Sequence, residues 1–499
     1  MCLLMKRLGK AANQGVPLVA VRTADQPATV RAISGGFGKA GWGVVSWDCA
    51  RGLQSIIDGD AAVGAICRDD GPPPEAIEAP DVVSLSAPER TVILILNAQR
   101  HLDARLAQAL LNARDPYAGS NRMVVLVGPS FEIPTELGSD VYIVDNALPD
   151  AEARGGIVDA VAKSAHVELS DAARSELVGT LRGLSPFAAS QVVSLASTPG
   201  ERIDLGESRS QWIETINAVP GLSVDMSGYT LNDVAGLESY KGFARRVAAG
   251  LNPPDTIVRV DEIDKAMGGV AGDSSGVSQA ILAALLTWME EKRATGIIAV
   301  GPSGAGKSLC SVATGAACAA PTLSFDLEAL KASLVGQSGE RTRAALKTLE
   351  AFAGRTFWIA TCNSLAVLPL ELRRRFKLGL WFFDLPTPAE ADALFSMYTT
   401  RYGVEDIRPA TYAGWSGAEI RNVCELARDL RMTPREASQY IVPGAVSAAD
   451  AVEALRRSAH GKYLSASQPG AYVYPGPLVA GPEPITTNTA ERRIGGFNG

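Results

Sequence analysis

The chain has 499 residues, of which 46% are hydrophobic and 20% charged, a composition typical of packed globular domains. Its formal net charge of -7 argues against nucleic acid as the main partner. The seven cysteines are scattered without a C-x-x-C pair, which argues against a disulfide framework or a zinc site and favours a reducing compartment. No uncharged apolar run is long enough to span a membrane, and the apolar part of the N-terminus is too short for a signal peptide, so we expect a cytoplasmic protein without a membrane partner.

Short apolar runs alternate with helical patterns in residues 1–150. One helix is expected at 104–113. Such alternation predicts an α/β domain whose mostly parallel sheet is covered by helices on both faces. The runs that read as buried strands are VPLVAVR (16–22), WGVVSW (42–47), TVILILN (91–97), RMVVLVG (122–128) and DVYIVD (140–145).

Residues 151–225 have a helical pattern throughout. We predict a helix over 169–181 that is capped by Ser170 and a second over 184–196 that is capped by Ser185, because serine side chains satisfy the free amides at a helix start. This segment is expected to be a small lid-like helical domain.

The second half repeats this plan. Residues 226–386 are expected to form an α/β core, 387–464 a helical lid, and 465–499, which is rich in Pro and Gly, an extended or disordered tail. The predicted strands of the core are TIVRV (256–260), GIIAV (296–300), TLSFD (322–326), TFWIAT (356–361) and LWFFDL (380–385).

The motif GPSGAGKS lies between a predicted strand and a predicted helix, which is the context of a phosphate-binding (Walker A) loop. Gly301, Gly304 and Gly306 let backbone amides wrap phosphate oxygens, Lys307 reaches the β and γ phosphates, and the Ser308 hydroxyl ligates magnesium. The alternative is a Gly-rich turn with a chance Lys-Ser pair. The predicted nucleotide-binding residues are Gly301, Pro302, Ser303, Gly304, Ala305, Gly306, Lys307, Ser308 and Leu309.

The stretch IVRVDEIDKAM (257–267) is an apolar strand that ends in two carboxylates. We interpret Asp261 as holding magnesium through a water and Glu262 as polarising the attacking water. The alternative is a strand that runs into a solvated acidic helix start. This stretch precedes the phosphate loop, whereas the usual order of the two motifs is the reverse.

Several phrases over roughly residues 229–462 resemble known motifs of the AAA clade of AAA+ ATPases. The resemblance implies a sheet with strand order 5-1-4-3-2, numbered by the family's usual sequence. Here the acidic (Walker B) strand comes before the phosphate-loop strand in the chain, so the resemblance implies a circularly permuted core. If the crossover connections stay right-handed, the acidic pair and the phosphate loop still lie at the same edge of the sheet. The phrases are DEIDKAMGG, SGVSQAILAALLTWMEEK, SLVGQSGERTRAALK, ATCNSLAVLPLELRRRF, FFDLPTPAEADALF and WSGAEIRNVCELA.

The same resemblance assigns Asn363 as the polar sensor that orients the attacking water, where a turn cap is the alternative. It also implies an arginine finger that reaches the nucleotide of a neighbouring subunit. The candidates are Arg373, Arg374 and Arg375, of which Arg375 or Arg373 is favoured. The stretch departs from the family's pattern, because the spacing glycine between the arginines is missing. A solvated basic turn is the alternative.

The resemblance further implies a pore loop at 333–340, which contains Leu334, Val335 and Gly336. Motor members of the family prefer an aromatic residue at the position of Leu334. The resemblance therefore supports polypeptide translocation less strongly than it supports ATP hydrolysis. The stretch WSGAEIR (415–421) starts a lid helix, and its Arg421 is a candidate for phosphate contact, with a surface role as the alternative.

The first half resembles a degenerate copy of the same unit. TVILILNAQRHL stands in place of the acidic strand and offers Asn97, Ala98 and Gln99, and no GxxxxGK[ST] pattern occurs before the one in the second half. A group of bacterial and plastid AAA proteins has this plan, including the joining phrase YTLNDVAGLESYKGF (229–243). We therefore expect the first half to bind no nucleotide productively and to serve in assembly or partner docking.

The resulting hypothesis is an ATPase that uses ATP and Mg²⁺, forms a homo-oligomeric ring, expected to be a hexamer, and remodels or translocates an unknown protein client. The alternative is a nucleotide-gated scaffold or assembly factor that does little mechanical work. A nucleic-acid motor is a third class, which the acidic composition and the lack of a basic tract disfavour.

Overall fold

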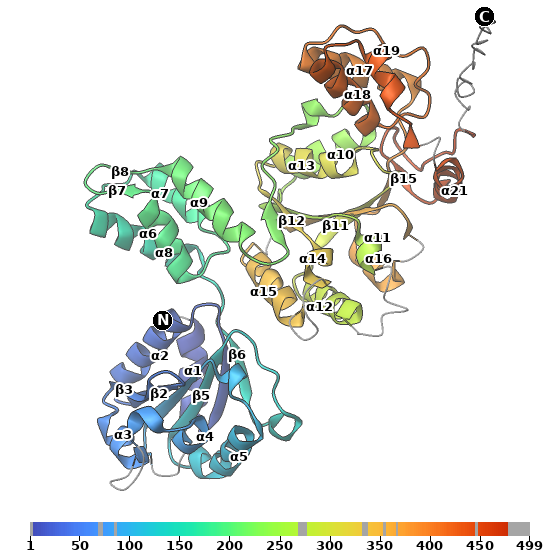
Figure 1. Cartoon of the computed structure of the whole chain (residues 1–499). Coiled ribbons are helices and arrows are strands. Elements are labelled where there is room, and N and C mark those ends of the chain that lie inside the picture. Colours follow the sequence, from blue (N-terminus) through green and yellow to red (C-terminus); the bar gives the residue numbers. More distant parts are fainter. Residues whose placement is uncertain are drawn as a thin grey trace, which may run out of the picture. The chain divides into compact units, whose positions relative to one another are not determined.

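The computed structural model (Figure 1) divides into two compact units, the first of Met1–Pro220 with Gly339–Phe352 and the second of Gly221–Ser338 with Ala353–Gly499. Each unit has its own sheet, and most strand pairs in both sheets are parallel. The predicted α/β class with parallel sheets is therefore confirmed. The residues that the structure describes are 3–67, 73–83, 87–267, 277–331, 338–352, 356–365, 368–444 and 448–477.

The first sheet has the strand order β3-β2-β4-β5-β1-β6. All neighbours are parallel except β3, which returns antiparallel beside β2 and was not predicted. The strands are β1 (Leu18–Arg22), β2 (Gly43–Asp48), β3 (Gly52–Ile57), β4 (Thr91–Leu96), β5 (Arg122–Gly128) and β6 (Tyr142–Asp145).

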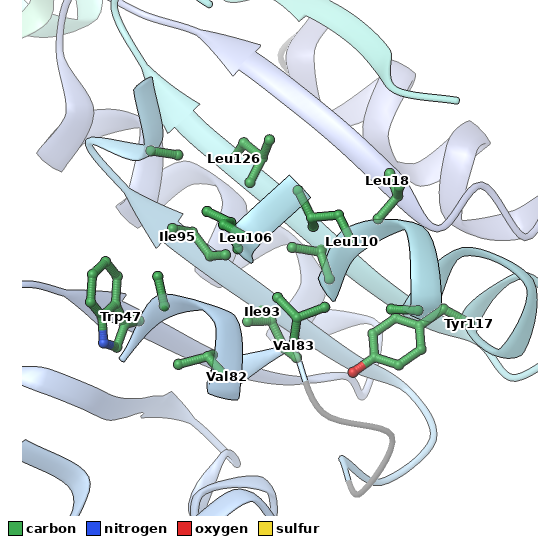
Figure 2. Packing of buried hydrophobic residues seen from close by; sticks show 14 of the residues in the cluster. Leu18, Trp47, Val82, Val83, Ile93, Ile95, Leu106, Leu110, Tyr117 and Leu126 are labelled. Carbon is green, nitrogen blue, oxygen red and sulfur yellow. The ribbon is translucent and has the colours of Figure 1, made fainter. Parts of the chain in front are cut away.

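Helices cover both faces of this sheet because alternate residues of each strand point to opposite sides. Ile93 and Ile95 of β4 belong to one buried cluster with Leu106 and Leu110 of α5, as Figure 2 shows. The residues between them contribute to a second cluster with α1 and α2. The helices are α1 (Leu3–Asn13) and α2 (Gln26–Lys39) on one face, and α3 (Asp60–Cys67), α4 (Ala79–Val82) and α5 (Ala104–Ala118) on the other.

A small helical group follows the first sheet. Both predicted caps are confirmed: Ser170 accepts a hydrogen bond from the Ala173 amide and Ser185 from the Ala188 amide, each at 3.2 Å. The group consists of α6 (Ala151–Ala165), α7 (Asp171–Thr180), α8 (Pro186–Leu195), α9 (Leu205–Asn217) and a short hairpin of β7 (Ser197–Thr198) and β8 (Arg202–Ile203).

The second sheet has the strand order β15-β14-β11-β13-β10-β12-β9. β10 begins and ends where the sequence predicted and lies between β13 and β12, parallel to both. Only β9, at one edge, is antiparallel to its neighbour. The strands are β9 (Leu222–Val224), β10 (Thr256–Val260), β11 (Thr295–Val300), β12 (Thr322–Phe325), β13 (Thr356–Cys362), β14 (Leu380–Phe382) and β15 (Leu464–Ser465).

Helices lie on both sides of the second sheet (Figure 1). On one side α10 and α13 share a cluster with β10, β11 and β13. On the other, Trp288 of α12 contacts Trp358 of β13, with ring centroids 5.4 Å apart. The helices are α10 (Glu238–Ala248), α11 (Ile263–Met267), α12 (Val277–Glu291), α13 (Lys307–Ala317), α14 (Leu327–Lys331) and α16 (Leu370–Arg375), while α15 (Ser338–Glu350) opens the segment that belongs to the first unit.

The C-terminal helices α17 (Pro388–Tyr402), α18 (Gly417–Leu430) and α19 (Pro434–Ala437) share an apolar cluster of their own. This helical group is called the lid below, after the domain predicted from the sequence. After α21 (Ala449–Ala459), the chain adds β15 to the sheet beside β14. The first part of the predicted tail then packs on the second unit: the Tyr240 amide donates to the Ala466 carbonyl at 2.9 Å, and the Tyr472 ring lies 4.4 Å from that of Phe382.

Candidate functional site

The Gly-rich loop spans Gly301–Gly306, between β11 and α13. Gly304 has a φ of 77°, and a Cβ at this position would lie 2.6 Å from the Ser416 hydroxyl of the lid. Gly306, with a φ of 90°, is the N-cap of α13. Both positions therefore require glycine, one for backbone conformation and close approach, the other for the helix start.

Lys307 is buried at the start of α13, with only 8% of its surface exposed. Its ammonium donates to the Gly301 carbonyl at 2.7 Å, the Pro302 carbonyl at 2.8 Å and the Asn363 side-chain oxygen at 2.9 Å. Burial lowers the pKa of Lys307 to about 8. The site thus holds a costly buried cation, which an anionic ligand would stabilise.

Asp261 directly follows β10, and the fold brings it to the phosphate loop. Ser308 Oγ donates to Asp261 Oδ1 at 2.7 Å, and Thr361 Oγ1 donates to the same oxygen at 3.1 Å. Arg259 Nε lies 2.8 Å from Asp261 Oδ2, and the other end of its guanidinium pairs with Asp225 at 2.7 Å. The charged residue inside the strand is therefore balanced by two carboxylates.

This donor set fits magnesium. The Ser308 hydroxyl and the Asp261 carboxylate are hard oxygen donors in direct contact. Mg²⁺ prefers few protein oxygens and completes its shell with water and substrate phosphates. Because these two donors fill only part of that shell, Mg²⁺ binding here would also require a ligand whose phosphate oxygens lie beside Ser308 and Asp261.

Glu262 has a left-handed backbone conformation, with a φ of 49°. Such a conformation costs a non-glycine residue about 1–2 kcal/mol. The Glu262 amide donates to Thr361 Oγ1 at 3.0 Å, which holds it in place. Its carboxylate pairs with Lys265 at 2.6 Å and lines the pocket described below.

Asp264 is a site residue that we did not predict. Its carboxylate oxygen Oδ2 accepts from the amides of Asn363 and Ser364, both at 3.2 Å, and only 8% of the residue is exposed. Asp264 thereby fixes the turn that presents Asn363 to Lys307. The signal in the sequence was the third acidic residue of DEID, three positions after Asp261.

A pocket of about 230 Å³ opens between the phosphate loop and the lid. Apolar side chains such as Leu237 and Leu394 line one part of it, and Lys307 and Glu262 line the other. Arg421 of α18 also lines it, and its Nε is buried without a hydrogen-bond partner in the described part of the chain. The pocket therefore suits a ligand with an apolar end and an anionic end.

The three consecutive arginines have different surroundings. Arg373 Nε donates to the Leu368 carbonyl at 3.0 Å, and Arg375 pairs with Glu290 at 2.8 Å. Arg374 is exposed and makes no hydrogen bond or ion pair with any residue that the structure describes. Arg373 and Arg375 are thus engaged within the chain, whereas the Arg374 side chain is exposed.

The predicted pore-loop residues Leu334, Val335 and Gly336 lie outside the described residues.

The first unit offers an internal comparison, because β5 and β13 are both seven residues long and each pairs with two parallel neighbours. Val260 pairs with the fifth residue of β13, as Ile95 pairs with the fifth residue of β5. Leu96 and Asn97 therefore occupy the positions of Asp261 and Glu262, one residue earlier than the sequence suggested. Asn97 keeps the left-handed conformation, with a φ of 50°.

The same alignment covers the rest of the site. Val127 stands where the second unit has Thr361, so the hydroxyl that holds the acidic pair is missing. Arg22 aligns with Val300, because each pairs with the last residue of its neighbouring strand. The link to the next helix is then only Thr23–Asp25, which has no room for a loop like Gly301–Gly306. The described part of the first unit therefore has the sheet but lacks the acidic pair, the threonine hydroxyl and the glycine-rich loop at these positions.

Parts of the chain are similar to known AAA proteins. A family model described as the N-terminal domain of SpoVK-like AAA ATPases matches residues 5–146. A curated protein, the uncharacterized AAA domain-containing protein ycf46 of Gracilaria tenuistipitata var. liui, is 27% identical over 148 residues. That match covers 21% of this chain and 30% of the relative, so the chain spans about a third of the relative's length.

Two solved structures are also similar: the FIGL-1 AAA domain, and the same domain in complex with ADP. They are 16% and 17% identical, have a TM-score of 0.30, and cover 49% of this chain and 94% and 95% of their own. Among the described residues, no helix combines the length and apolarity needed to cross a membrane. The family match and the curated relative show that part of the chain is similar to AAA ATPases.

Proposed function

We propose that the chain is a magnesium-dependent ATPase of the AAA+ type that works in the cytoplasm as a homo-oligomeric ring, a hexamer, and remodels or translocates a protein client. The observation that carries the proposal is the 2.7 Å hydrogen bond from Ser308 Oγ to Asp261 Oδ1. The segment that contains Asp261 precedes the segment that contains Ser308, the reverse of the usual order of these two motifs. The two side chains are nevertheless in direct contact in the folded chain.

In this proposal the loop Gly301–Gly306 and Lys307 bind the phosphates of ATP, and Ser308 and Asp261 hold Mg²⁺, Asp261 through a water. The metal ion supplies charge neutralisation for phosphoryl transfer. Glu262 polarises the attacking water. Asn363, aimed by Asp264 and hydrogen-bonded to Lys307, orients that water near the γ phosphate.

We also propose that the core is a rearranged form of the family's, in which one strand and its following helix have moved in front of the phosphate-loop strand, a transposition rather than a circular permutation. The parallel strands lie in the order β14-β11-β13-β10-β12, which matches 5-1-4-3-2 if β10 takes the third role. The first unit supports this, since its strands β6-β1-β5-β4-β2 have the same spatial order with the unpermuted chain order. Transposing one strand and its following helix thus leaves the sheet unchanged.

The first half is proposed to be a degenerate module that binds no nucleotide productively and serves in ring assembly or partner docking. Leu96 and Asn97 at the positions of Asp261 and Glu262 support this, because neither side chain is acidic. The short link Thr23–Asp25 in place of the phosphate loop is a second, independent support.

The arginine that reaches the neighbouring nucleotide is proposed to come from α16. Arg373 and Arg375 were favoured from the sequence, but both already hold partners within the chain. Arg374, which was the less favoured of the three candidates, is exposed and therefore remains one. Substituting each with alanine and measuring ATPase activity of mixed oligomers identifies the finger: its loss lowers turnover without weakening ATP binding.

Glu262→Gln tests the proposal directly. We expect the variant to bind ATP as the wild type does and to hydrolyse it roughly a hundredfold or more slowly, since a positioned base contributes about that much. Glu328→Gln, which changes an exposed acidic residue of α14, is the matched control and should retain both properties. Normal turnover by the Glu262 variant would refute the assigned role, and Lys307→Ala should remove ATP binding itself.

The main alternative is a nucleotide-gated scaffold or assembly factor, which Leu334 in place of an aromatic residue favours. Leu334→Ala distinguishes the two. A remodeller should keep its ATPase activity and lose its action on the client, whereas a scaffold should lose neither. A nucleic-acid motor would instead reveal itself by DNA or RNA binding that weakens steeply with salt.

A further inference from the structure

The carboxylate of Asp25 joins two helix N-termini in the first unit. Oδ1 accepts from the Ala28 amide at 3.0 Å and so caps α2. Oδ2 accepts from the Phe187 amide, also at 3.0 Å, in the first turn of α8, although Phe187 lies 162 residues away in sequence. Only 7% of Asp25 is exposed. One buried anion therefore connects the sheet domain to its helical group.

The second unit makes the corresponding connection differently. Asp25 ends the link that replaces the phosphate loop, and α8 begins like α18, with a capping serine followed by the helix. Phe187 and Ala418 are both the second residue of their helices. The Ala418 amide donates to the Gly304 carbonyl of the phosphate loop at 3.2 Å, whereas the Phe187 amide donates to a charged side chain.

Two threonine hydroxyls lie beside Asp25, and both donate to its backbone carbonyl. Thr23 and Thr29 are buried and share a hydrogen bond of 2.7 Å between their hydroxyls, and Asn146 donates to Thr29 at 2.9 Å. The hydrogen bonds that hold the Asp25 carboxylate come from backbone amides at two helix starts. Helix N-termini favour a negative charge, and that is the role a phosphate group plays at such positions.

We propose that Asp25 is a built-in substitute for an anionic ligand, which holds α8 against α2 and keeps the first unit closed without any nucleotide. Because the carboxylate belongs to the chain, the contact does not depend on ligand concentration. The first unit is then fixed in one state while the second responds to ligand. This inference rests on contacts within the first unit and does not require ATPase activity in the second.

Asp25→Asn in the full chain tests the proposal with little risk to folding, because Asn caps helices about as well as Asp. The asparagine amide has one acceptor oxygen, so it can accept a hydrogen bond from only one of the two helix N-termini. At the other helix its NH₂ group faces a backbone N–H, and two donors cannot form a hydrogen bond. Hydrogen exchange of peptides from α2 and α8 should therefore become roughly tenfold faster or more in one of them, given the strength of bonds to charged groups. Asp25→Ala should accelerate both.

Asp103→Asn is the matched control, since Asp103 caps only its own helix α5, by accepting from the Leu106 amide at 2.9 Å. It should leave exchange in α2 and α8 unchanged. Unchanged exchange in both helices of Asp25→Ala would overturn the proposal. Addition of ATP should not alter α8 in the wild type, and slowing of α8 by ATP would also overturn it. Whether α18 slows with ATP tests the proposed ATP binding alone.

Discussion

At the scale of single residues, the most unusual group is the buried ammonium of Lys307, whose pKa burial lowers to about 8. Phosphate binds the charged form, so ligand affinity depends on the fraction protonated. That fraction falls as the pH rises through 8, and affinity should be roughly tenfold lower at pH 9 than at pH 7. Titration with a fluorescent ATP analogue at constant ionic strength measures this.

Lys307→Arg is the control for this pH dependence, because a guanidinium stays charged throughout the range. If that variant binds the analogue, its affinity should not change between pH 7 and pH 9. A wild-type affinity that is equally flat would contradict the assignment of Lys307 as the phosphate ligand.

Asp264 should act on catalysis through Asn363. Asp264→Ala removes the acceptor of the Asn363 and Ser364 amides and frees the turn, so we expect kcat for ATP to fall roughly tenfold or more with little change in KM. Asp264→Asn retains an acceptor oxygen and should restore most of the activity. Steady-state kinetics of both variants test this role. If the two variants lose the same amount of kcat, or if only KM changes, Asp264 has a different role.

The sequence pointed to most of the charged residues of the candidate site, Asp264 excepted, but not to the contacts that hold them. Lys307, Ser308 and Asp261 were found because local motifs mark them. Asp264 and Thr361 form hydrogen bonds with residues about a hundred positions away in the sequence. These contacts could be identified only from the structure, in which β10 and β13 are neighbouring strands. Pairwise tertiary contacts leave no local pattern.

At the scale of elements, the C-terminal segment is fastened to the core by a buried ion pair. Arg456 of α21 lies 2.9 Å from Asp384, and Tyr472 donates to the same carboxylate at 2.7 Å. Asp384 follows β14 and also lines the candidate pocket. The segment that contains Arg456 and Tyr472 is therefore in direct contact with a residue that lines the candidate pocket.

Loss of this pair should destabilise the second unit strongly. The side chains of Arg456 and Asp384 are only 5% and 14% exposed, and removing one partner of a buried pair costs about 3–5 kcal/mol. Arg456→Met should lower the free energy of unfolding in urea by that amount. Arg457→Met, on the same helix but with a side chain 64% exposed, should change it by less than about 0.5 kcal/mol. Equal effects of both substitutions would contradict the coupling.

Strands with several apolar residues were predicted well, since β10 and β13 are buried along their whole length or nearly so. The elements missed were short or lay at sheet edges. β15 has two residues and β9 has three, too few for a periodic signal. The segment after β15 lacks periodicity too, and it is held by single contacts such as Tyr472 on Phe382.

At the scale of the whole molecule, two sheets share one spatial strand order, but only one has the polar groups of a phosphate site. Ligand should therefore stabilise the second unit alone. At an ATP concentration of 100 times Kd, we expect about 2.7 kcal/mol of stabilisation in that unit, and none in the first. Calorimetry with and without Mg-ATP should show one part of the unfolding heat moving to higher temperature, and Lys307→Ala should abolish the movement. A shift of the entire transition in the Lys307 variant would contradict this.

The place of β10 in the middle of its sheet has a consequence for synthesis. Both of its neighbours, β12 and β13, leave the ribosome after it, whereas in the first unit the middle strand β4 finds β2 already made. Before β12 and β13 are synthesised, β10 has no strand partner, and its apolar side chains are exposed on the nascent chain. These side chains are Ile257, Val258 and Val260, which are fully buried in the folded protein. Translation that pauses before β13 should therefore leave an aggregation-prone intermediate, and chaperones are expected to bind it.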